Sequence, residues 1–199
     1  TWTEVTVSGS EKQWETVEGS KNDFTLFAGV YNGLIYKSVD GGESWVELTN
    51  SGSEYWKCLD VSDDGQRVAA GYSTLQRMKY STDGGDTWAT ANYSVTAPGT
   101  VRYISGLDKF ISAPDQSGTL MISNAAGSDW VQLRPESVSY RGVDSNLSGA
   151  QIIAGINNNY LVQTDLNGNS YTTITEPGQL DWRDIAIKDN GAKIFAVSR

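Results

Sequence analysis

The 199 residues contain no histidine and a single cysteine, Cys58. Without histidine the chain cannot build a Ser-His-Asp triad, a Cys-His nucleophile pair or a metal site with imidazole ligands. One cysteine cannot form a disulfide bond within the chain. No apolar run approaches the roughly 18 residues of a membrane-spanning helix. The sequence therefore predicts no metal, no cofactor and no membrane insertion, and it excludes the His-dependent hydrolases.

Positive charge is also scarce: 15 Lys and Arg stand against 24 Asp and Glu, for a formal net charge of −9 at pH 7. A surface of this sign repels the phosphates of nucleic acids, so we expect no nucleic-acid partner. Aromatic rings and glycine are abundant, with seven Trp, ten Tyr, four Phe and 21 Gly. Large aromatic residues separated by glycine-rich turns favour β-structure over helices.

An eight-residue pattern that ends in an aromatic ring recurs along the chain. Its four copies end 43, 42 and 41 residues apart and span Ser38–Trp45, Ser81–Trp88, Ser123–Trp130 and Thr164–Tyr171. A second series keeps nearly the same spacing and begins at Trp14, Trp56, Val101, Tyr140 and Trp182. Two independent features with one period indicate an internal repeat.

The pattern within one unit predicts strands throughout. Apolar residues alternate in Trp56–Val61, a turn follows at Asp63–Gln66, and three more strands are expected at Arg67–Tyr72, Gln76–Ser81 and Trp88–Ala91. No 11-residue window shows a convincing helical period. Four short antiparallel strands in about 42 residues predict one blade of a β-propeller.

The turn in the eight-residue pattern has a physical explanation. In Ser-x-Asp-Gly-Gly-x-Ser/Thr-Trp, the Asp carboxylate can accept hydrogen bonds from the amides that follow it. Gly42, Gly85, Gly127 and Gly168 occupy the one position kept in all four copies, which is consistent with a positive φ. The closing ring is expected to lie beneath the hairpin.

These segments resemble the Asp-box, or BNR, repeat of sialidases, sortilin-type receptors, xyloglucanase-type glycosidases and Ycf48-like photosystem assembly factors. Ala125 and Leu166 stand where Asp belongs in the third and fourth copies, so Asn124 and Asp165 are expected to hold those turns. The resemblance implies that the box is a structural turn on the outer rim, distant from any ligand. The structural Asp-box residues expected on this basis are Ser38, Asp40, Gly42, Trp45, Ser81, Asp83, Gly85, Trp88, Ser123, Gly127, Trp130, Thr164, Gly168 and Tyr171.

The sequence predicts an all-β fold, a single β-propeller domain over residues 1–199 with about five four-stranded blades, Asp-box turns and an incomplete last blade. The repeats run over residues 2–45, 45–88, 88–130, 130–171 and 171–199. The last unit supplies strands at Trp182–Ile187 and Ile194–Ser198, and Thr1–Val5 is expected as the outer strand of that blade. Because unpaired strand edges recruit strands, we expect residues beyond Arg199 or a strand of a neighbouring subunit to fill the gap. The second case would make the protein a homo-oligomer or part of a larger assembly.

An enzymatic function has no signature in this sequence. A sialidase needs an arginine trio and a Tyr/Glu pair, and a xyloglucanase needs two carboxylates across a cleft between two propellers. Seven Arg are present without a local signature, and no pair stands out among 24 carboxylates. We therefore expect no catalysis, and the alternative is a fragment of a larger glycoside hydrolase of the Asp-box type.

A basic residue follows the opening residue of the second series in four of the five units. These residues are Lys57, Arg102, Arg141 and Arg183. If they open the innermost strands, they form a ring at one mouth of the central channel, where they could hold an anion, a carboxylate of a partner or an acidic sugar. The alternative is a structural role in which Asp60, Asp144 and Asp184 neutralise them.

The predicted function is a non-enzymatic recognition or scaffold module that binds a protein or a glycan, in an extracellular, cell-surface or periplasmic location. The aromatic residues beside the basic ring are expected in the core rather than as sugar platforms; they are Trp14, Trp56, Tyr140 and Trp182. Asn92 and Asn146 begin glycosylation sequons, but two or three such sequons are expected by chance in this composition.

Overall fold

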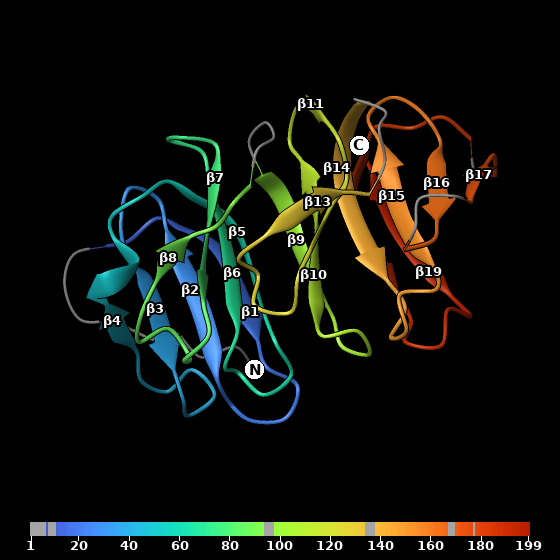
Figure 1. The fold of residues 1–199 in the computed structure, drawn as a ribbon. Coiled ribbons are helices and arrows are strands. Elements are labelled where there is room, and N and C mark those ends of the chain that lie inside the picture. The colour runs from blue at the N-terminus through green and yellow to red at the C-terminus, as the bar shows by residue number, and fades with distance from the viewer. Residues whose placement is uncertain (1–6, 8–10, 94–97, 134–137, 167–169, 177) are drawn as a thin grey trace.

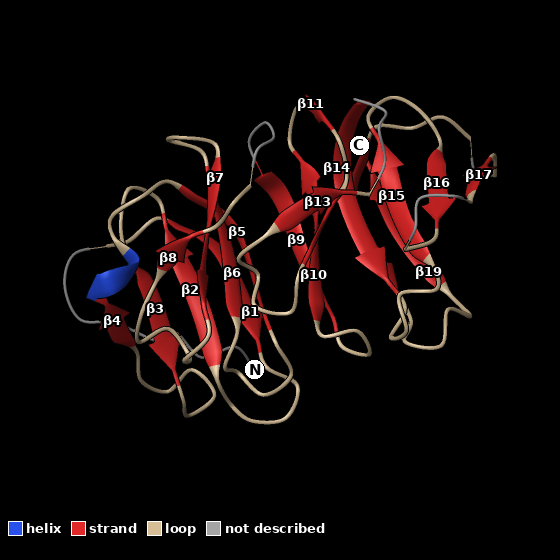
Figure 2. Ribbon diagram, in the orientation of Figure 1, coloured by secondary structure: helices blue, strands red, loops and turns tan. Residues whose placement is uncertain are grey.

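The computed structural model describes residue 7 and residues 11–93, 98–133, 138–166, 170–176 and 178–199. Within these ranges the chain consists of strands and turns, apart from a three-residue 3-10 helix at Thr49–Ser51 (Figure 2). Successive strands pair antiparallel through short connections. The predicted all-β fold is confirmed.

The first two sheets each contain four strands in chain order. The first sheet is formed by β1 (Trp14–Gly19), β2 (Leu26–Val30), β3 (Ile35–Ser38) and β4 (Val46–Leu48). The second is formed by β5 (Trp56–Val61), β6 (Val68–Tyr72), β7 (Arg77–Ser81) and β8 (Ala89–Thr90). The four strands predicted for this second unit are confirmed, with bounds that differ by at most one residue.

The third and fourth sheets repeat this arrangement. The third contains β9 (Pro98–Ile104), β10 (Lys109–Pro114), β12 (Met121–Ser123) and β13 (Trp130–Gln132). The fourth contains β14 (Val138–Ser145), β15 (Ile152–Ile156), β16 (Leu161–Thr164) and β17 (Tyr171–Ile174). Between β10 and β12 lies the short strand β11 (Ser117–Gly118), which pairs with the start of β14 and so ties the third blade to the fourth.

The fifth sheet has two described strands, β18 (Trp182–Ile187) and β19 (Ile194–Ser198), with the predicted bounds. The expected outer strand at Thr1–Val5 lies outside the described residues and stays a prediction.

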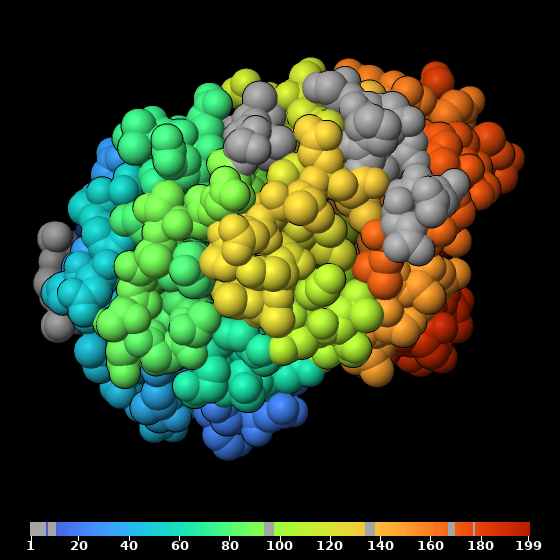
Figure 3. All heavy atoms as spheres, in the orientation of Figure 1, coloured from blue at the N-terminus to red at the C-terminus, as the bar shows by residue number. Residues whose placement is uncertain are grey.

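The five sheets follow one another side by side in chain order, from the blue first sheet to the red fifth (Figures 1 and 3). Their first strands are innermost, and each packs against the next: β1 on β5, β5 on β9, β9 on β14 and β14 on β18. Four hydrophobic cores lie between successive sheets; representative pairs are Phe27 with Trp56, Met78 with Phe110, Ile111 with Tyr140, and Ile153 with Trp182. Sheets that bury their faces against one another around shared inner strands form the blades of a β-propeller.

The first two Asp-box turns contain the expected hydrogen bonds. Asp83 accepts the Thr87 N–H at 2.9 Å with Oδ1 and the Thr87 hydroxyl at 2.6 Å with Oδ2. The Ser81 Oγ accepts the N–H of Gly85 at 2.8 Å. The copy at Ser38–Trp45 makes the same contacts. These hydrogen bonds to the charged form lower the pKa of Asp83 to about 2.

The closing ring fixes the turn in the first three copies. The indole N–H groups of Trp45, Trp88 and Trp130 donate to the carbonyl oxygens of Gly42, Gly85 and Gly127 at 3.1, 2.9 and 2.9 Å. These glycines have the predicted positive φ, at 97°, 90° and 77°. In the third copy Asn124 replaces the missing Asp, because its Oδ1 accepts the Ser128 N–H at 3.0 Å. Gly168 of the fourth copy lies outside the described residues, so its role and that of Asp165 stay predictions.

Candidate functional site

All five inner strands have a β-bulge near their start, where one residue is skipped in the pairing with the second strand. The skipped residues are Glu15, Lys57, Gly99, Arg141 and Arg183. The structure therefore places three of the four predicted basic residues at one common position, on the second, fourth and fifth blades. They lie at the end of the channel where the inner strands begin.

Arg102 does not belong to this set. The bulge of β9 holds Gly99, since Pro98 opens the strand where the other units have an aromatic residue. Arg102 lies three residues further along, at the position that Asp60 has in β5. The prediction that Arg102 and Lys57 are equivalent is therefore wrong, because the sequence comparison was aligned on the wrong opening residue in the third unit.

The two bulge arginines are paired with carboxylates from nearby loops. Arg141 Nη1 lies 2.8 Å from Asp115 Oδ1, and Arg183 Nη2 lies 2.6 Å from Asp181 Oδ2. Lys57 Nζ instead lies over a neighbouring tyrosine ring, 5.0 Å from its centroid. The partners of the bulge arginines thus differ from the aspartates of the inner strands that the sequence suggested.

Two polar atoms near the bulges are buried without a hydrogen-bond partner in the described part of the chain. They are Arg141 Nε and Asp181 Oδ1. Buried polar groups are nearly always paired, by protein, water or ligand. Because both atoms are buried, they offer no accessible contact to a ligand in this conformation.

The opposite end of the inner strands surrounds a polar cavity of about 240 Å³, to which all five blades contribute. Its charged lining residues are Glu18, Lys21, Asp60, Asp63, Arg102, Asp144 and Asp189. Arg102 reaches across this cavity, with Nη1 3.2 Å from Glu18 Oε1 and Nη2 3.7 Å from Asp184 Oδ1. It thereby ion-pairs the third blade with the first and the fifth.

Two carboxylates of this cavity join neighbouring blades. Asp60 accepts the Tyr103 N–H from the third blade at 2.6 Å, and Asp144 accepts the Ile187 N–H from the fifth blade at 2.8 Å. Burial, with a further contribution from Glu18, raises the pKa of Asp60 to about 7. Burial also raises the pKa of Glu18 and of Asp144. Sequence reasoning missed these links because nothing in the repeat distinguishes them from surface aspartates.

The aromatic residues that open the inner strands are core residues in three units. Trp56, Tyr140 and Trp182 are 0%, 1% and 2% exposed, which confirms the prediction that they lie in the core. The prediction that Trp14 is also a core residue is wrong, because its side chain in the first blade is 43% exposed. It is the one member of this series that remains accessible among the described residues.

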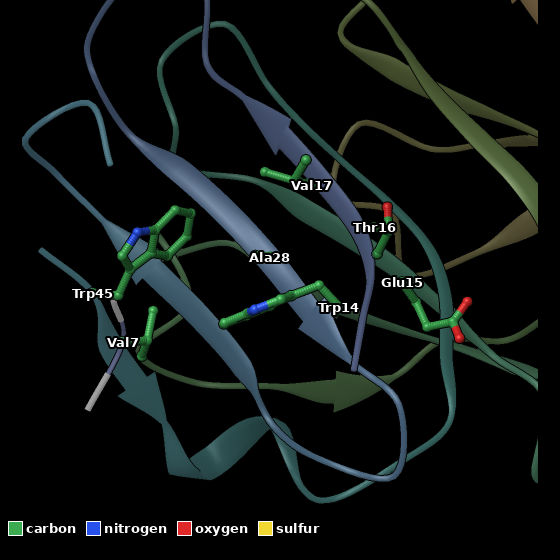
Figure 4. Close-up of a pocket in the computed structure, with 7 residues that line it drawn as sticks. All are labelled: Val7, Trp14, Glu15, Thr16, Val17, Ala28 and Trp45. Atoms are coloured by element: carbon green, nitrogen blue, oxygen red, sulfur yellow. The ribbon is translucent and has the colours of Figure 1, made fainter. Parts of the chain in front are cut away.

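Trp14 lines an apolar groove of about 350 Å³ on the free side of the first blade (Figure 4). Val17 and Trp45 form part of its wall, and Val7 lies beside them. The Trp14 and Trp45 rings are tilted, with centroids 6.2 Å apart.

The described ranges contain no group of three or more His, Cys, Asp or Glu side chains arranged to hold a metal ion. They also contain no helix with the length and apolar character needed to cross a bilayer. The thiol of Cys58 is buried, which raises its pKa to about 12 and makes it a poor nucleophile.

No family model and no curated protein matches this sequence. Among solved structures, the chain is similar over 90% of its length to an ancestral GH74 enzyme, with a TM-score of 0.71 and 12% identity. It is similar over 92% of its length to the GH74 enzyme of Niastella koreensis, with a TM-score of 0.78 and 14% identity. It spans 28% and 33% of those two proteins.

A third solved structure, Ycf48 from Cyanidioschyzon merolae, matches the whole chain at a TM-score of 0.74 and 18% identity, and 67% of that protein is covered. The chain has the fold of an Asp-box β-propeller. This propeller fold is shared by GH74 glycosidases and by an assembly factor, so the fold alone does not decide between catalysis and recognition.

Proposed function

We propose that this Asp-box propeller is a non-catalytic recognition or scaffold module that binds an acidic segment of a partner protein. The observation that carries the proposal is the recurrence of a cation in the bulges of three inner strands, at Lys57, Arg141 and Arg183. The chain has a net charge of −9, so cations at one repeated position stand out from the acidic background. An acidic ligand at this end would be attracted by Lys57 and would compete with Asp115 and Asp181 for the two arginines.

The guanidinium groups of Arg141 and Arg183 have N–H donors that their present partners do not use. A guanidinium has five N–H donors, and a carboxylate binds two of them side by side. Arg183 donates to Asp181 through Nη2, and Arg141 donates to Asp115 through Nη1, while Nε of Arg141 has no partner in the described structure. The Arg183 side chain is 41% exposed, so a carboxylate of a partner protein could reach its remaining donors, whereas Nε of Arg141 is buried.

A glycosidase activity is the second candidate, and the polar cavity is the observation that favours it. Glycoside hydrolysis uses two carboxyl groups, one of which has a raised pKa. Asp60 has a pKa of about 7 and shares the cavity with Glu18, whose pKa is also raised. Two observations argue against catalysis. Asp60 accepts hydrogen bonds from the backbone N–H groups of Val61 and Tyr103, and Glu18 forms an ion pair with Arg102. Both carboxylates therefore already stabilise the fold.

The test is a double charge reversal at the bulges, Lys57→Glu with Arg183→Glu. The control is a double reversal of the same net charge, Lys188→Glu with Lys193→Glu, at exposed positions at the opposite end of the fifth blade. A poly-glutamate peptide is the probe, titrated by fluorescence anisotropy at low salt. We expect the bulge variant to lose at least tenfold in affinity and the double control variant to change it less than twofold. Equal loss in both variants would show that net charge alone attracts the peptide and would refute the site.

A panel of acidic and neutral glycans and a set of chromogenic glycosides complete the test. Binding of an acidic glycan in place of the peptide, lost in the same bulge variant, would make the ligand a glycan. Turnover of a glycoside that Asp60→Asn abolishes would replace recognition with catalysis as the function.

A further inference from the structure

One position of the inner strands carries mostly charged side chains at a single level of the channel. In each blade this residue pairs with the second strand in the same register, and the five residues are Glu18, Asp60, Arg102, Asp144 and Ala186. We call them the inner ring. The first four line the polar cavity described above, and Ala186 adds only a methyl group. Three carboxylates therefore stand against one guanidinium, so the inner ring has an excess of negative charge.

The rest of the cavity lining does not supply the missing positive charge. The other cation of the lining is Lys21, whose Nζ lies 3.9 Å from Asp63 Oδ1 and 3.8 Å from Asp189 Oδ1. Both distances are longer than a hydrogen bond, so this ammonium is held loosely. The side chains of Lys21 and Asp189 are 56% and 73% exposed, so they lie at a mouth that is open to solvent. A positively charged molecule that enters by this mouth meets more carboxylates than cations.

The carboxylates of the inner ring are ionised at a cost that the chain's own cations do not remove. Burial raises the pKa of Glu18, Asp60 and Asp144, because their charged forms lose contact with water. Arg102 lowers all three pKa values without offsetting the effect of burial. A further cation inside the cavity would stabilise the ionised forms of all three groups.

The size of the cavity indicates a small organic cation rather than a metal ion. In the described ranges no three acidic side chains converge in a way that could hold a metal ion. The cavity volume of about 240 Å³ lies just below the range of roughly 300–1,000 Å³ that is typical of pockets for drug-sized ligands. A molecule with a few carbon atoms and an ammonium group fits this space.

Two polar atoms on the cavity wall indicate which groups such a molecule carries. Oε1 of Glu18 accepts a hydrogen bond from Arg102, whereas its Oε2 has no hydrogen-bond partner among the described residues. Asn146 is 8% exposed, and its Oδ1 accepts the Gln151 N–H at 3.1 Å. The Nδ2 of Asn146 donates to no residue in the described part of the chain. An ammonium group satisfies the first atom and a hydroxyl oxygen satisfies the second.

We propose that the polar cavity binds a small primary amine that also carries a hydroxyl group. Its ammonium group donates to Glu18 and supplies the positive charge that the inner ring lacks. Its hydroxyl oxygen accepts from Nδ2 of Asn146, and this contact distinguishes an amino alcohol from a simple amine. The cavity lies at the end of the inner strands opposite to the bulges, so this site does not depend on the acidic ligand proposed above.

The experiment compares three small molecules that share one three-carbon skeleton. Serinol carries an ammonium group between two hydroxyl groups, glycerol has a hydroxyl in place of the ammonium, and isopropylamine lacks both hydroxyls. Each is titrated into the protein at pH 7 in an amine-free buffer. Affinity is measured from the NMR shifts of the Tyr103 and Ile187 amides, which donate to the cavity residues Asp60 and Asp144. We expect serinol to bind at least about tenfold more tightly than glycerol or isopropylamine, because each of these lacks one of the two contacts.

Two substitutions test the two contacts separately. Asn146→Asp keeps the Oδ1 acceptor but removes the donor, so serinol should bind this variant no more tightly than isopropylamine does. Lys21→Gln removes the competing ammonium at the mouth and should raise the affinity for serinol about threefold. Its control is Lys193→Gln, which removes the same charge from an exposed position outside the cavity lining and should have no effect.

The result that would overturn the proposal is an affinity of the unmodified chain for serinol that equals its affinity for glycerol or for isopropylamine. An Asn146→Asp variant that keeps the full preference for serinol would also overturn it. So would equal gains in Lys21→Gln and Lys193→Gln, because the net charge of the protein alone would then attract the amine.

Discussion

The two ends of the inner strands use charged residues in different ways. Where the strands begin, Arg183 pairs with Asp181, two residues away, whereas Arg141 pairs with Asp115 of the third blade. Where they end, Arg102 pairs with Glu18 and Asp184, which belong to two other blades. The difference teaches that a charge is structural when its partner belongs to another blade, because its loss then separates elements that are distant in the sequence. Arg102 and Arg141 meet this criterion, whereas the Arg183 pair is local.

Charge reversal at Arg102 is expected to have the largest effect on stability. Arg102→Glu places a carboxylate among Glu18, Asp60 and Asp144 and removes the cation that offsets them. Breaking a largely buried ion pair in this way should lower the free energy of unfolding by about 3 kcal/mol. Urea denaturation followed by tryptophan fluorescence measures the change.

The matched reversal is Arg183→Glu at the other end of the channel. Its side chain is 41% exposed and its ion pair is local, so we expect a change below about 0.5 kcal/mol. Equal losses in the two variants would contradict the division into a structural end and a binding end.

Removal of a carboxylate that joins two blades is expected to have the next largest effect. Asp144→Ala leaves the Ile187 N–H without its acceptor at a part-buried position, which should cost about 2 kcal/mol. Asp144→Asn keeps an acceptor oxygen and should cost less. Hydrogen exchange at the Ile187 amide provides a local measurement, and unchanged protection in Asp144→Ala would contradict the link.

Periodicity made the repeat and its turns predictable from the sequence. The Asp-box spacing indicates the repeating blades, and Asn124 was identified because it precedes Ala125 and its amide oxygen can accept the same hydrogen bonds. The strands at Trp182–Ile187 and Ile194–Ser198 followed from their likeness to earlier units. Such patterns depend only on residues within one unit, so they can be recognised in the sequence.

The strand register and the contacts between blades could not be predicted from the sequence, because both depend on neighbouring units. Pro98 opens β9 without an aromatic ring, so the comparison shifted Arg102 by three residues into the wrong set. Trp14 and Trp56 occupy equivalent places, yet one is 43% exposed and the other fully buried, since the first blade lacks a preceding neighbour in the described chain. A residue's own repeat cannot reveal whether another blade covers it.

The last prediction concerns the pH dependence of stability, which also separates the two uses of charge. Burial raises the pKa of Asp60 to about 7, so the folded state holds this proton more tightly than the unfolded chain. The contribution of Asp60 to stability is complete below about pH 3.9, the pKa of an aspartate in the unfolded chain, and is lost as the pH rises through 7. The exposed Asp83 has a pKa of about 2, so its contribution is present above about pH 4 and is lost as the pH falls towards 2.

The melting temperature should therefore pass through a maximum near pH 4 to 5 and fall by a few degrees towards pH 8. Asp60→Asn should start from a lower melting temperature, because an amide accepts fewer of the backbone hydrogen bonds, but it should flatten the decline above pH 5. Asp83→Asn should flatten the decline below pH 4 and leave the upper limb unchanged. A melting temperature that rises steadily from pH 5 to pH 8 in the unmodified chain would contradict the assignment of Asp60. It would show that its carboxylate is ionised without penalty in the folded state, and hence that this end of the channel is as open to water as the other.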